Sequence, residues 1–205
     1  RVTHDVPSVH PTVVVSTRDR NVLAIESEVR GALGNGVDSF LVVTGDTVPA
    51  VDHLAHHYEI VEHLEELKDR IGIAFEVGIP TRFRKWQMKR RMELRPDFLV
   101  VGPIIDPATL DAELDRLGWD PTMPPLHLMV LPPFSRRWAE NAEGFGAVAA
   151  TEGLKARLDE TDDRRSLAWD AATEVATRAE ALGLGGIVLT GLKPATVIGE
   201  AAAWR

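Results

Sequence analysis

The chain of 205 residues contains no cysteine. Disulfide bonds, thiolate metal ligands and thiol nucleophiles are therefore excluded together, and a reducing compartment fits such a composition. Long apolar stretches are also missing. Residues 1–12 have neither the basic start nor the apolar region of a signal peptide, and no run approaches the roughly 18 apolar residues of a membrane span. We therefore expect a cytoplasmic protein with no membrane partner.

Positive charge is scarce, since 23 Lys and Arg stand against 31 Asp and Glu, for a formal net charge of −8. An acidic chain repels phosphate backbones, so nucleic-acid binding would need a strong local basic patch. Residues 82–95 come nearest to one, because seven of these fourteen residues are Lys or Arg, interleaved with aromatic and methionine side chains. A solvated helix face explains such a run more simply, and we expect no nucleic-acid partner.

The chain does contain a regular alternation of apolar, β-branched runs with stretches of helical periodicity. The six runs cover residues 9–16, 37–45, 73–79, 97–105, 125–132 and 185–192. A helical pattern follows each run, and the longest, over residues 136–181, is interrupted near Gly144 and Gly146 and again at residues 161–165. Near-continuous apolar strands between helices predict a parallel sheet covered by helices, in one α/β domain over residues 1–205.

Two α/β architectures fit this alternation: an open doubly wound sheet, or a (β/α)8 barrel of which six units are present. A glycine-rich dinucleotide fingerprint usually follows the first strand of a doubly wound sheet. No such fingerprint follows any of the six runs. Its absence favours the barrel.

In either fold, ligands meet the carboxyl ends of the parallel strands, so the residues at the ends of the apolar runs are candidates for a site. These residues are Ser16, Thr17, Arg18, Asp19, Thr44, Gly45, Asp46, Glu76, Gly78, Gly102, Pro103, Pro132, Phe134, Ser135, Thr190, Gly191 and Lys193. They include three acids, two cations, one aromatic residue and several small residues. Such a set predicts a polar, partly anionic pocket for an organic ligand that carries several hydrogen-bond donors.

The acids of this set have two interpretations each. Asp46 either binds a ligand or closes its strand as a turn residue. Asp19 either belongs to the site or pairs locally with Arg18, and Asp19 or Asn21 can cap the helix that follows. Glu76 lies inside an apolar run, where an inward-facing carboxyl would be desolvated and its proton affinity raised. If Glu76 faces outward instead, it is a salt-bridge partner.

Two segments, "STRDRN" at residues 16–21 and "VTGD" at residues 43–46, resemble the T-C-R-D-R-N and V-T-G-D segments of the methylenetetrahydrofolate reductases in order and spacing. "RVTHDVP", "DFLVVGPIIDP" and "LMVLPPFS" resemble further segments of that family. The resemblance implies a (β/α)8 TIM barrel of which this chain holds strands three to eight. It also implies reduction of 5,10-methylenetetrahydrofolate to 5-methyltetrahydrofolate. The family's first strand carries an E-F-F-P-P glutamate, thought to protonate the folate, and we expect the sequence to be an incomplete record of a longer barrel.

The resemblance also implies roles for individual residues. Asp46 aligns with a family aspartate beside the pterin, where a carboxylate can accept hydrogen bonds from the pterin edge. Together with Glu76, which the apolar run singles out, Asp46 is our predicted catalytic residue. Phe134 can stack on the folate or simply pack in the core. The predicted folate contacts are Thr17, Asp19, Asp46, Gly102, Phe134 and Lys193. The predicted cofactor contacts are Thr44, Gly45, Arg90 and Arg91, of which the arginines would meet a dinucleotide pyrophosphate.

The family's flavin contacts are altered in three places. Val14 replaces a histidine, Gly102 replaces a glutamine, and a long loop is shortened to "IPTRFRK". We therefore predict hydride transfer from NADH directly to the folate, without FAD. The alternatives are an FAD-dependent reductase and a non-catalytic folate-binding barrel. The residues predict neither the oligomeric state nor the choice between NADH and NADPH.

Histidines crowd one predicted helix, at positions 53, 56, 57 and 63. Two of them are spaced i, i+4, but neither a third ligand motif nor an H-E-x-x-H segment accompanies them. We predict no metal site.

Overall fold

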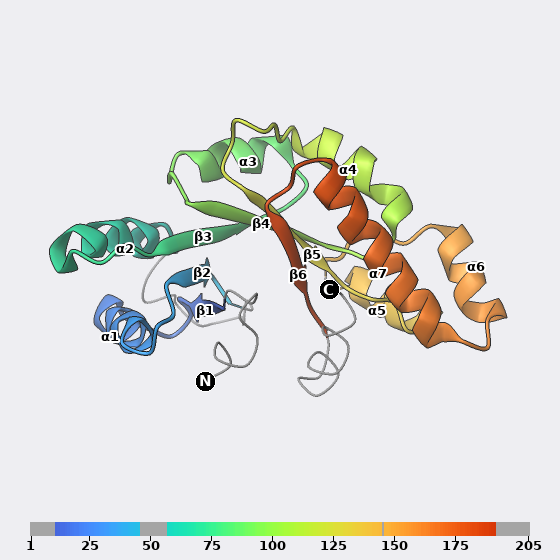
Figure 1. Cartoon of the computed structure of the whole chain (residues 1–205), viewed down its shortest axis with the longest axis horizontal. Coiled ribbons are helices and arrows are strands. Elements are labelled where there is room, and N and C mark those ends of the chain that lie inside the picture. The colour runs from blue at the N-terminus through green and yellow to red at the C-terminus, as the bar shows by residue number, and fades with distance from the viewer. Residues whose placement is uncertain (1–10, 46–56, 145, 192–205) are drawn as a thin grey trace. The chain divides into compact units, whose positions relative to one another are not determined.

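The structure, a computed structural model, describes residues 11–45, 57–144 and 146–191, in which strands and helices alternate along the chain (Figure 1). The strands are β1 (Thr12–Ser16), β2 (Ser39–Val43), β3 (Glu76–Thr81), β4 (Phe98–Ile104), β5 (Leu126–Val130) and β6 (Gly186–Leu189). The helices are α1 (Val22–Leu33), α2 (His57–Ile71), α3 (Lys85–Met92), α4 (Leu110–Leu117), α5 (Arg136–Gly144), α6 (Glu152–Glu160) and α7 (Arg164–Ala181), with a 3-10 turn, η1 (Pro107–Thr109), before α4.

The strands follow one another in the sheet in chain order, β1-β2-β3-β4-β5-β6. The pairs β1–β2, β2–β3 and β5–β6 are parallel. Parallel neighbours joined by helices confirm the predicted α/β class. The finer prediction, a (β/α)8 barrel holding strands three to eight, stays a prediction.

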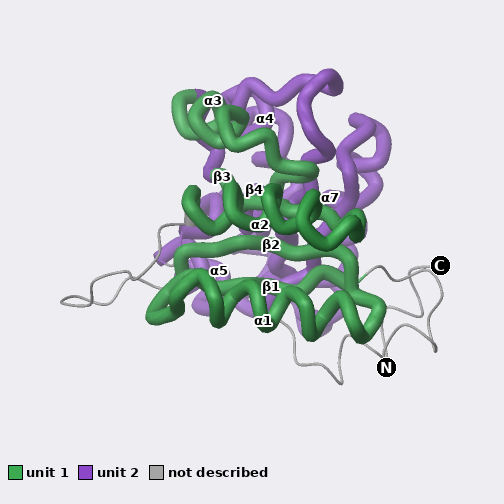
Figure 2. Tube along the Cα trace, turned by 90° about the vertical axis from the view of Figure 1, so that its left-hand side faces the viewer, with its two compact units in different colours: residues 1–81, 86–100 green, residues 82–85, 101–205 purple. Residues whose placement is uncertain are grey.

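The chain divides into two compact units (Figure 2). Unit 1 comprises Arg1–Thr81 and Trp86–Val100, and unit 2 comprises Arg82–Lys85 and Val101–Arg205. Strand β4 contributes residues to both units, because the boundary falls between Val100 and Val101. The predicted single domain over residues 1–205 stays a prediction.

The core of unit 1 is built on β2, whose first four residues are all buried. Phe40 of this strand meets Phe75 edge to face, with ring centroids 5.5 Å apart. Helix α1 buries Ile25 and Val29, which are four residues apart and share one face. Helix α2 adds a second apolar face, formed by Ile60, Val61, Leu64 and Leu67, all of which are fully buried. Burial of leucine- and isoleucine-sized side chains contributes about 1.5–3 kcal/mol each.

The core of unit 2 lies beneath α5, α6 and α7. One cluster of buried side chains comprises Ile105, Leu131, Ala139, Ala142, Ala150, Leu154, Leu158 and Leu167, with Trp138 and Ala147 packed against it. Helix α7 presents mostly small residues to the interior, and its buried residues include Ala168, Ala171, Ala172, Val175 and Ala179. Small side chains allow this long helix to pack close to its neighbours.

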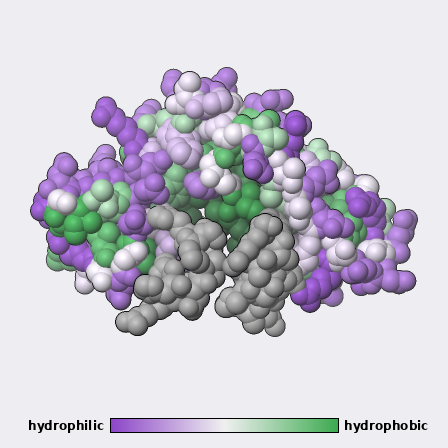
Figure 3. All heavy atoms as spheres, in the orientation of Figure 1, coloured by the Kyte–Doolittle hydropathy of each residue, from purple (hydrophilic) through white to green (hydrophobic). Residues whose placement is uncertain are grey.

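Hydrophilic side chains are spread over the helices of both units on the face drawn in Figure 3. This is the pattern of helices that cover a sheet with one face and meet water with the other. Within the described part of the chain, none of the helices combines the length and the apolar character that crossing a membrane requires.

Several strand ends differ from the predicted runs by one to three residues. The third strand begins at Glu76 rather than at residue 73, because Gly72 ends α2 with φ +63 and pairing with β2 starts only at Glu76. The fourth strand, predicted over residues 97–105, is Phe98–Ile104, so Gly102, which we expected at its carboxyl end, lies within the strand. The predicted interruptions of the helical region 136–181 are confirmed, since it is divided into α5, α6 and α7.

Candidate functional site

The carboxyl ends of β1 and β2 are in contact in unit 1. The Thr17 N–H donates to the Val43 carbonyl at 2.9 Å and extends the strand pairing by one residue. Gly45 has φ +79, and a β-carbon built on it would lie 2.7 Å from Ser16 Oγ and 3.1 Å from Arg18 Cβ. Ser16 and Arg18 of the "STRDRN" segment are therefore neighbours of Gly45 in space, and only glycine allows this approach.

Thr17 is fully buried, and its hydroxyl has no hydrogen-bond partner within the described ranges. A buried hydroxyl without a partner costs on the order of 1–3 kcal/mol. Such groups in native structures call for an explanation, and a ligand or a further chain segment can supply one. The prediction that Thr17 contacts the folate remains open, and the hydroxyl has the chemistry for it.

The acid Asp19 and its neighbours take local roles at the start of α1. Arg18 Nε lies 3.2 Å from Asp19 Oδ2, and Asp19 has a positive φ of 56°. Asn21, rather than Asp19, caps the helix, because its side-chain oxygen accepts the Ala24 N–H at 2.9 Å. Of the two interpretations of Asp19, the local ion pair is the one that the described contacts support.

Glu76 is not where the catalytic interpretation requires it. It is the first residue of β3, its side chain is exposed, and its N–H donates to the Asp38 carbonyl at 2.7 Å. The amino end of a parallel strand lies at the edge opposite to the one where ligands bind. Of the two interpretations of Glu76, the exposed side chain supports the outward-facing one, and the catalytic role of Glu76 stays a prediction.

Arg90 and Arg91 both contact the ring of Tyr58 on α2. Their guanidinium carbons lie 5.1 Å and 5.2 Å from its centroid, a cation–π arrangement. Arg91 is 8% exposed, and this burial lowers its pKa. The described contacts thus give the pair a packing role between α3 and α2, and their prediction as pyrophosphate ligands stays a prediction.

Gly102 is required by the packing of unit 2. With φ +128, a β-carbon on it would lie 2.7 Å from the Met129 carbonyl of β5. The backbone here leaves no room for the glutamine that the resemblance implies at this position.

Phe134, after β5, meets Trp138 and Trp169 edge to face, with centroid distances of 6.2 Å and 6.4 Å. Phe134 therefore belongs to an aromatic cluster, which is the packing interpretation, while stacking on a folate is untested.

Three further residues were predicted to contact a ligand, namely Thr44, Asp46 and Lys193. Thr44 follows β2 directly and is half-buried, so it lies at the expected edge of the sheet. Asp46 and Lys193 fall outside the described residues. Within the described ranges, no group of three or more His, Asp or Glu side chains is arranged to hold a metal ion.

Asp106 is a buried acid that the sequence interpretation did not single out. It is 3% exposed, and its Oδ2 accepts the Thr151 N–H at 2.9 Å and the Thr151 hydroxyl at 2.6 Å. Its Oδ1 accepts the Ala108 N–H at 2.9 Å. An acid directly before Pro107, at the end of an apolar run, is a local signal for such a cap. Its bond to Thr151, 45 residues away, has no local signal.

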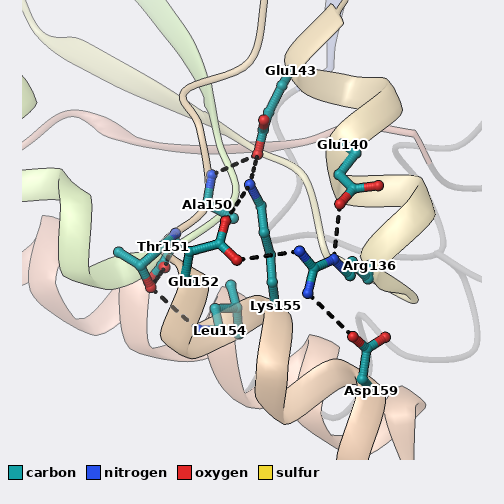
Figure 4. A network of polar contacts seen from close by, with 10 residues as sticks. Arg136, Glu140, Glu143, Ala150, Thr151, Glu152, Leu154, Lys155 and Asp159 are labelled. Atoms are coloured by element: carbon teal, nitrogen blue, oxygen red, sulfur yellow. Dashed lines mark hydrogen bonds and ion pairs between the residues drawn. The ribbon is translucent and has the colours of Figure 1, made fainter.

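A network of charged side chains holds α5 and α6 together (Figure 4). Lys155 Nζ lies 3.1 Å from Glu143 Oε1, which also accepts the Ala150 N–H at 3.0 Å. The hydrogen bond that Lys155 donates to Glu143 raises the pKa of Lys155. Arg136 pairs with Glu140 at 2.8 Å and extends to acids of α6. Through Glu143 the network also holds Ala150, which lies between the two helices.

The fold and these positions define a protein with parallel strands and candidate ligand contacts at their carboxyl ends. No protein-family model matches the chain, and no protein of curated function matches it either. Similar solved structures include a Clostridium thermocellum protein that binds two copies of 5-methyl-5,6,7,8-tetrahydrofolic acid (9% identity, 93% of this chain and 91% of that chain, TM-score 0.48). A 7,8-dihydropteroate synthase from Vibrio fischeri has 12% identity over 95% of this chain and 68% of that chain, with TM-score 0.48. A Rhizomucor miehei β-1,3-glucanosyltransferase has 14% identity over 85% and 62%, with TM-score 0.49. Similarities at this level carry no argument about the function of the chain.

Proposed function

We propose that the chain binds a reduced folate at the carboxyl ends of its strands and reduces 5,10-methylenetetrahydrofolate to 5-methyltetrahydrofolate with NADH. One observation carries the proposal. The two segments that most resemble the methylenetetrahydrofolate reductases are far apart in the sequence, yet Gly45 of one packs against Ser16 and Arg18 of the other. Their contact supports a shared site.

The reaction adds one hydride and one proton to the folate and converts NADH to NAD⁺. The hydride goes to the methylene carbon. One of the two bonds from this carbon to nitrogen breaks, and the proton goes to the nitrogen that is released. Asp46, which follows Gly45, would accept hydrogen bonds from the amino and ring N–H groups of the pterin and so orient it. The buried Thr17 hydroxyl, next to the same edge, would give the ligand a further partner.

The proposed route uses no flavin. Its main support is Gly102, where the backbone contact with Met129 excludes the larger side chain that the resemblance implies for flavin binding. We expect purified protein to be colourless and to oxidise NADH only when methylenetetrahydrofolate is present. A bound chromophore absorbing near ~450 nm, which is a property of the isoalloxazine ring itself, would instead identify an FAD-dependent reductase.

A non-catalytic folate-binding protein is the second candidate, and the position of Glu76 favours it. Glu76 is exposed at the amino end of β3, so the proposed site has no acid from this strand. Calorimetric titration with 5-methyltetrahydrofolate, together with the NADH assay, separates the candidates. Binding with turnover supports the reductase, and binding without turnover supports the second candidate. The absence of folate binding would contradict both.

A further inference from the structure

Unit 2 contains a pocket that shares only Gly102 with the predicted folate contacts. Its volume is about 400 Å³, within the range of small-molecule sites. The pocket is lined by Arg82, Phe83, Arg84, Gly102, Thr109, Glu113, Arg116, Gly146, Ala147, Val148 and Ala149. Loop residues, one face of α4 and the segment after α5 thus form its walls.

The charge of this lining is opposite to that of the whole protein. Arg82, Arg84 and Arg116 supply three positive charges against one acid, Glu113, in a chain of net charge −8. Glu113 forms an ion pair with Arg116, three residues later on α4. The residues that line the pocket therefore have a formal net charge of +2, a charge that favours an anionic ligand.

The two loop arginines are held in place by the residue between them. Phe83 is 4% exposed, while Arg82 and Arg84 on either side of it are exposed. The Arg84 N–H donates to the Arg82 carbonyl at 2.6 Å, which makes this segment a tight turn. A loop that is anchored before the ligand arrives loses less conformational freedom on binding.

The facing wall is fixed as well. The Val148 N–H donates to the Pro103 carbonyl at 2.9 Å, and the Ala147 N–H donates to the Ala142 carbonyl at 3.0 Å. The Glu143 carboxylate, which forms an ion pair with Lys155, accepts the N–H of Ala150, two residues after Val148 (Figure 4). This wall is small and partly apolar, so it suits an organic group beside the anion.

We propose that this pocket binds the phosphate group of a small phosphorylated molecule. Guanidinium groups bind phosphate oxygens with paired, charge-assisted hydrogen bonds, and two of them on one short turn match a group with several anionic oxygens. The volume accommodates the phosphate together with part of a sugar or nucleoside. The inference does not depend on folate binding, because no predicted folate contact other than Gly102 lines the pocket.

Calorimetric titration of the whole chain at low salt tests the proposal with ADP, pyrophosphate and ribose 5-phosphate, and with adenosine as the uncharged control. We expect phosphate-bearing probes to bind, adenosine to bind far more weakly, and affinity to fall as salt rises. Preference for ADP would identify a nucleotide, and preference for ribose 5-phosphate a sugar phosphate. If pyrophosphate binds as tightly as ADP and ribose 5-phosphate, the phosphate group alone determines the affinity. Each of these three results supports the proposal.

Arg82→Gln and Arg84→Gln should each weaken binding about 3- to 10-fold, the effect of a charge-assisted hydrogen bond reduced by solvent exposure. Arg137→Gln is the matched control, since it removes one exposed positive charge of the same unit that does not line the pocket. The melting temperature should hardly change in any of the three. The proposal fails if no phosphate-bearing probe binds, if adenosine binds as tightly as ADP, or if both loop variants bind like the control.

Discussion

A β-carbon on Gly45 would lie 2.7 Å from Ser16 Oγ, so the ends of β1 and β2 approach too closely for a side chain at this position. We expect Gly45→Ala to destabilise the protein by about 1–3 kcal/mol, because alanine is strained at φ +79 and Ser16 and Arg18 must move. Folate affinity should fall with it. Urea denaturation and folate titration measure the two effects.

The control for this variant is Gly36→Ala. Gly36 has the same φ of +79, but nothing lies within 4 Å of the position that a β-carbon would take there. The control therefore includes the backbone strain without the contact. Equal losses of stability and unchanged folate affinity in both variants would show that the contact with Ser16 is immaterial.

Asp46→Asn tests the residue assigned to the pterin edge. The change keeps the side-chain shape but replaces an acceptor by a donor, which would face donors of the pterin. Such a mismatch costs about 1–3 kcal/mol, or roughly 5- to 150-fold in kcat/KM for the folate. Steady-state kinetics measures it. Full activity combined with a lower melting temperature would instead make Asp46 a turn residue.

Asp106→Asn should destabilise the protein by about 1–3 kcal/mol. Oδ1 accepts the Ala108 N–H and Oδ2 accepts the Thr151 N–H, so the amide nitrogen must face a backbone donor in either orientation. Asp120→Asn is the control, because both bonds from Thr122 fall on one oxygen, which asparagine keeps. Urea denaturation should separate the two variants, and equal stability would contradict the buried-cap assignment.

Glu26 should make stability depend on pH. Hydrogen bonds from Arg30, Arg70 and His63 lower its pKa from 4.5 to about 2, and His63 Nε2 lies 2.7 Å away. Because the folded pKa is the lower one, the contribution is complete above pH 4.5 and is lost as the pH falls through 2. Glu26→Gln should therefore be less stable than the parent protein at pH 7, and this difference should shrink between pH 4.5 and 2.

Glu28→Gln is the control on the same helix, since it removes a more exposed carboxylate that pairs with Arg20. Its stability difference from the parent should be small at every pH. Denaturation at a series of pH values compares the two variants. A difference for Glu26→Gln that does not vary with pH would rule out the carboxylate as its source.

Local patterns in the sequence determined the class of fold and several element boundaries. The alternation of apolar runs with helical periodicity predicted parallel strands joined by helices, because both periods follow from backbone geometry over a few residues. The breaks between α5, α6 and α7 were visible for the same reason. The Asn21 cap was among the local alternatives, since a cap acts within one turn of helix.

Only the tertiary structure decided the features that depend on distant partners. Pairing with β2 begins at Glu76, which places that acid at the amino end of its strand and leaves it exposed. The Met129 carbonyl excludes any side chain at Gly102. Thr151 satisfies Asp106 from 45 residues away, and the arginines of one loop and of α4 line a single pocket. Strand register, backbone approach and the convergence of charges are set by packing between elements, which no local stretch of residues specifies.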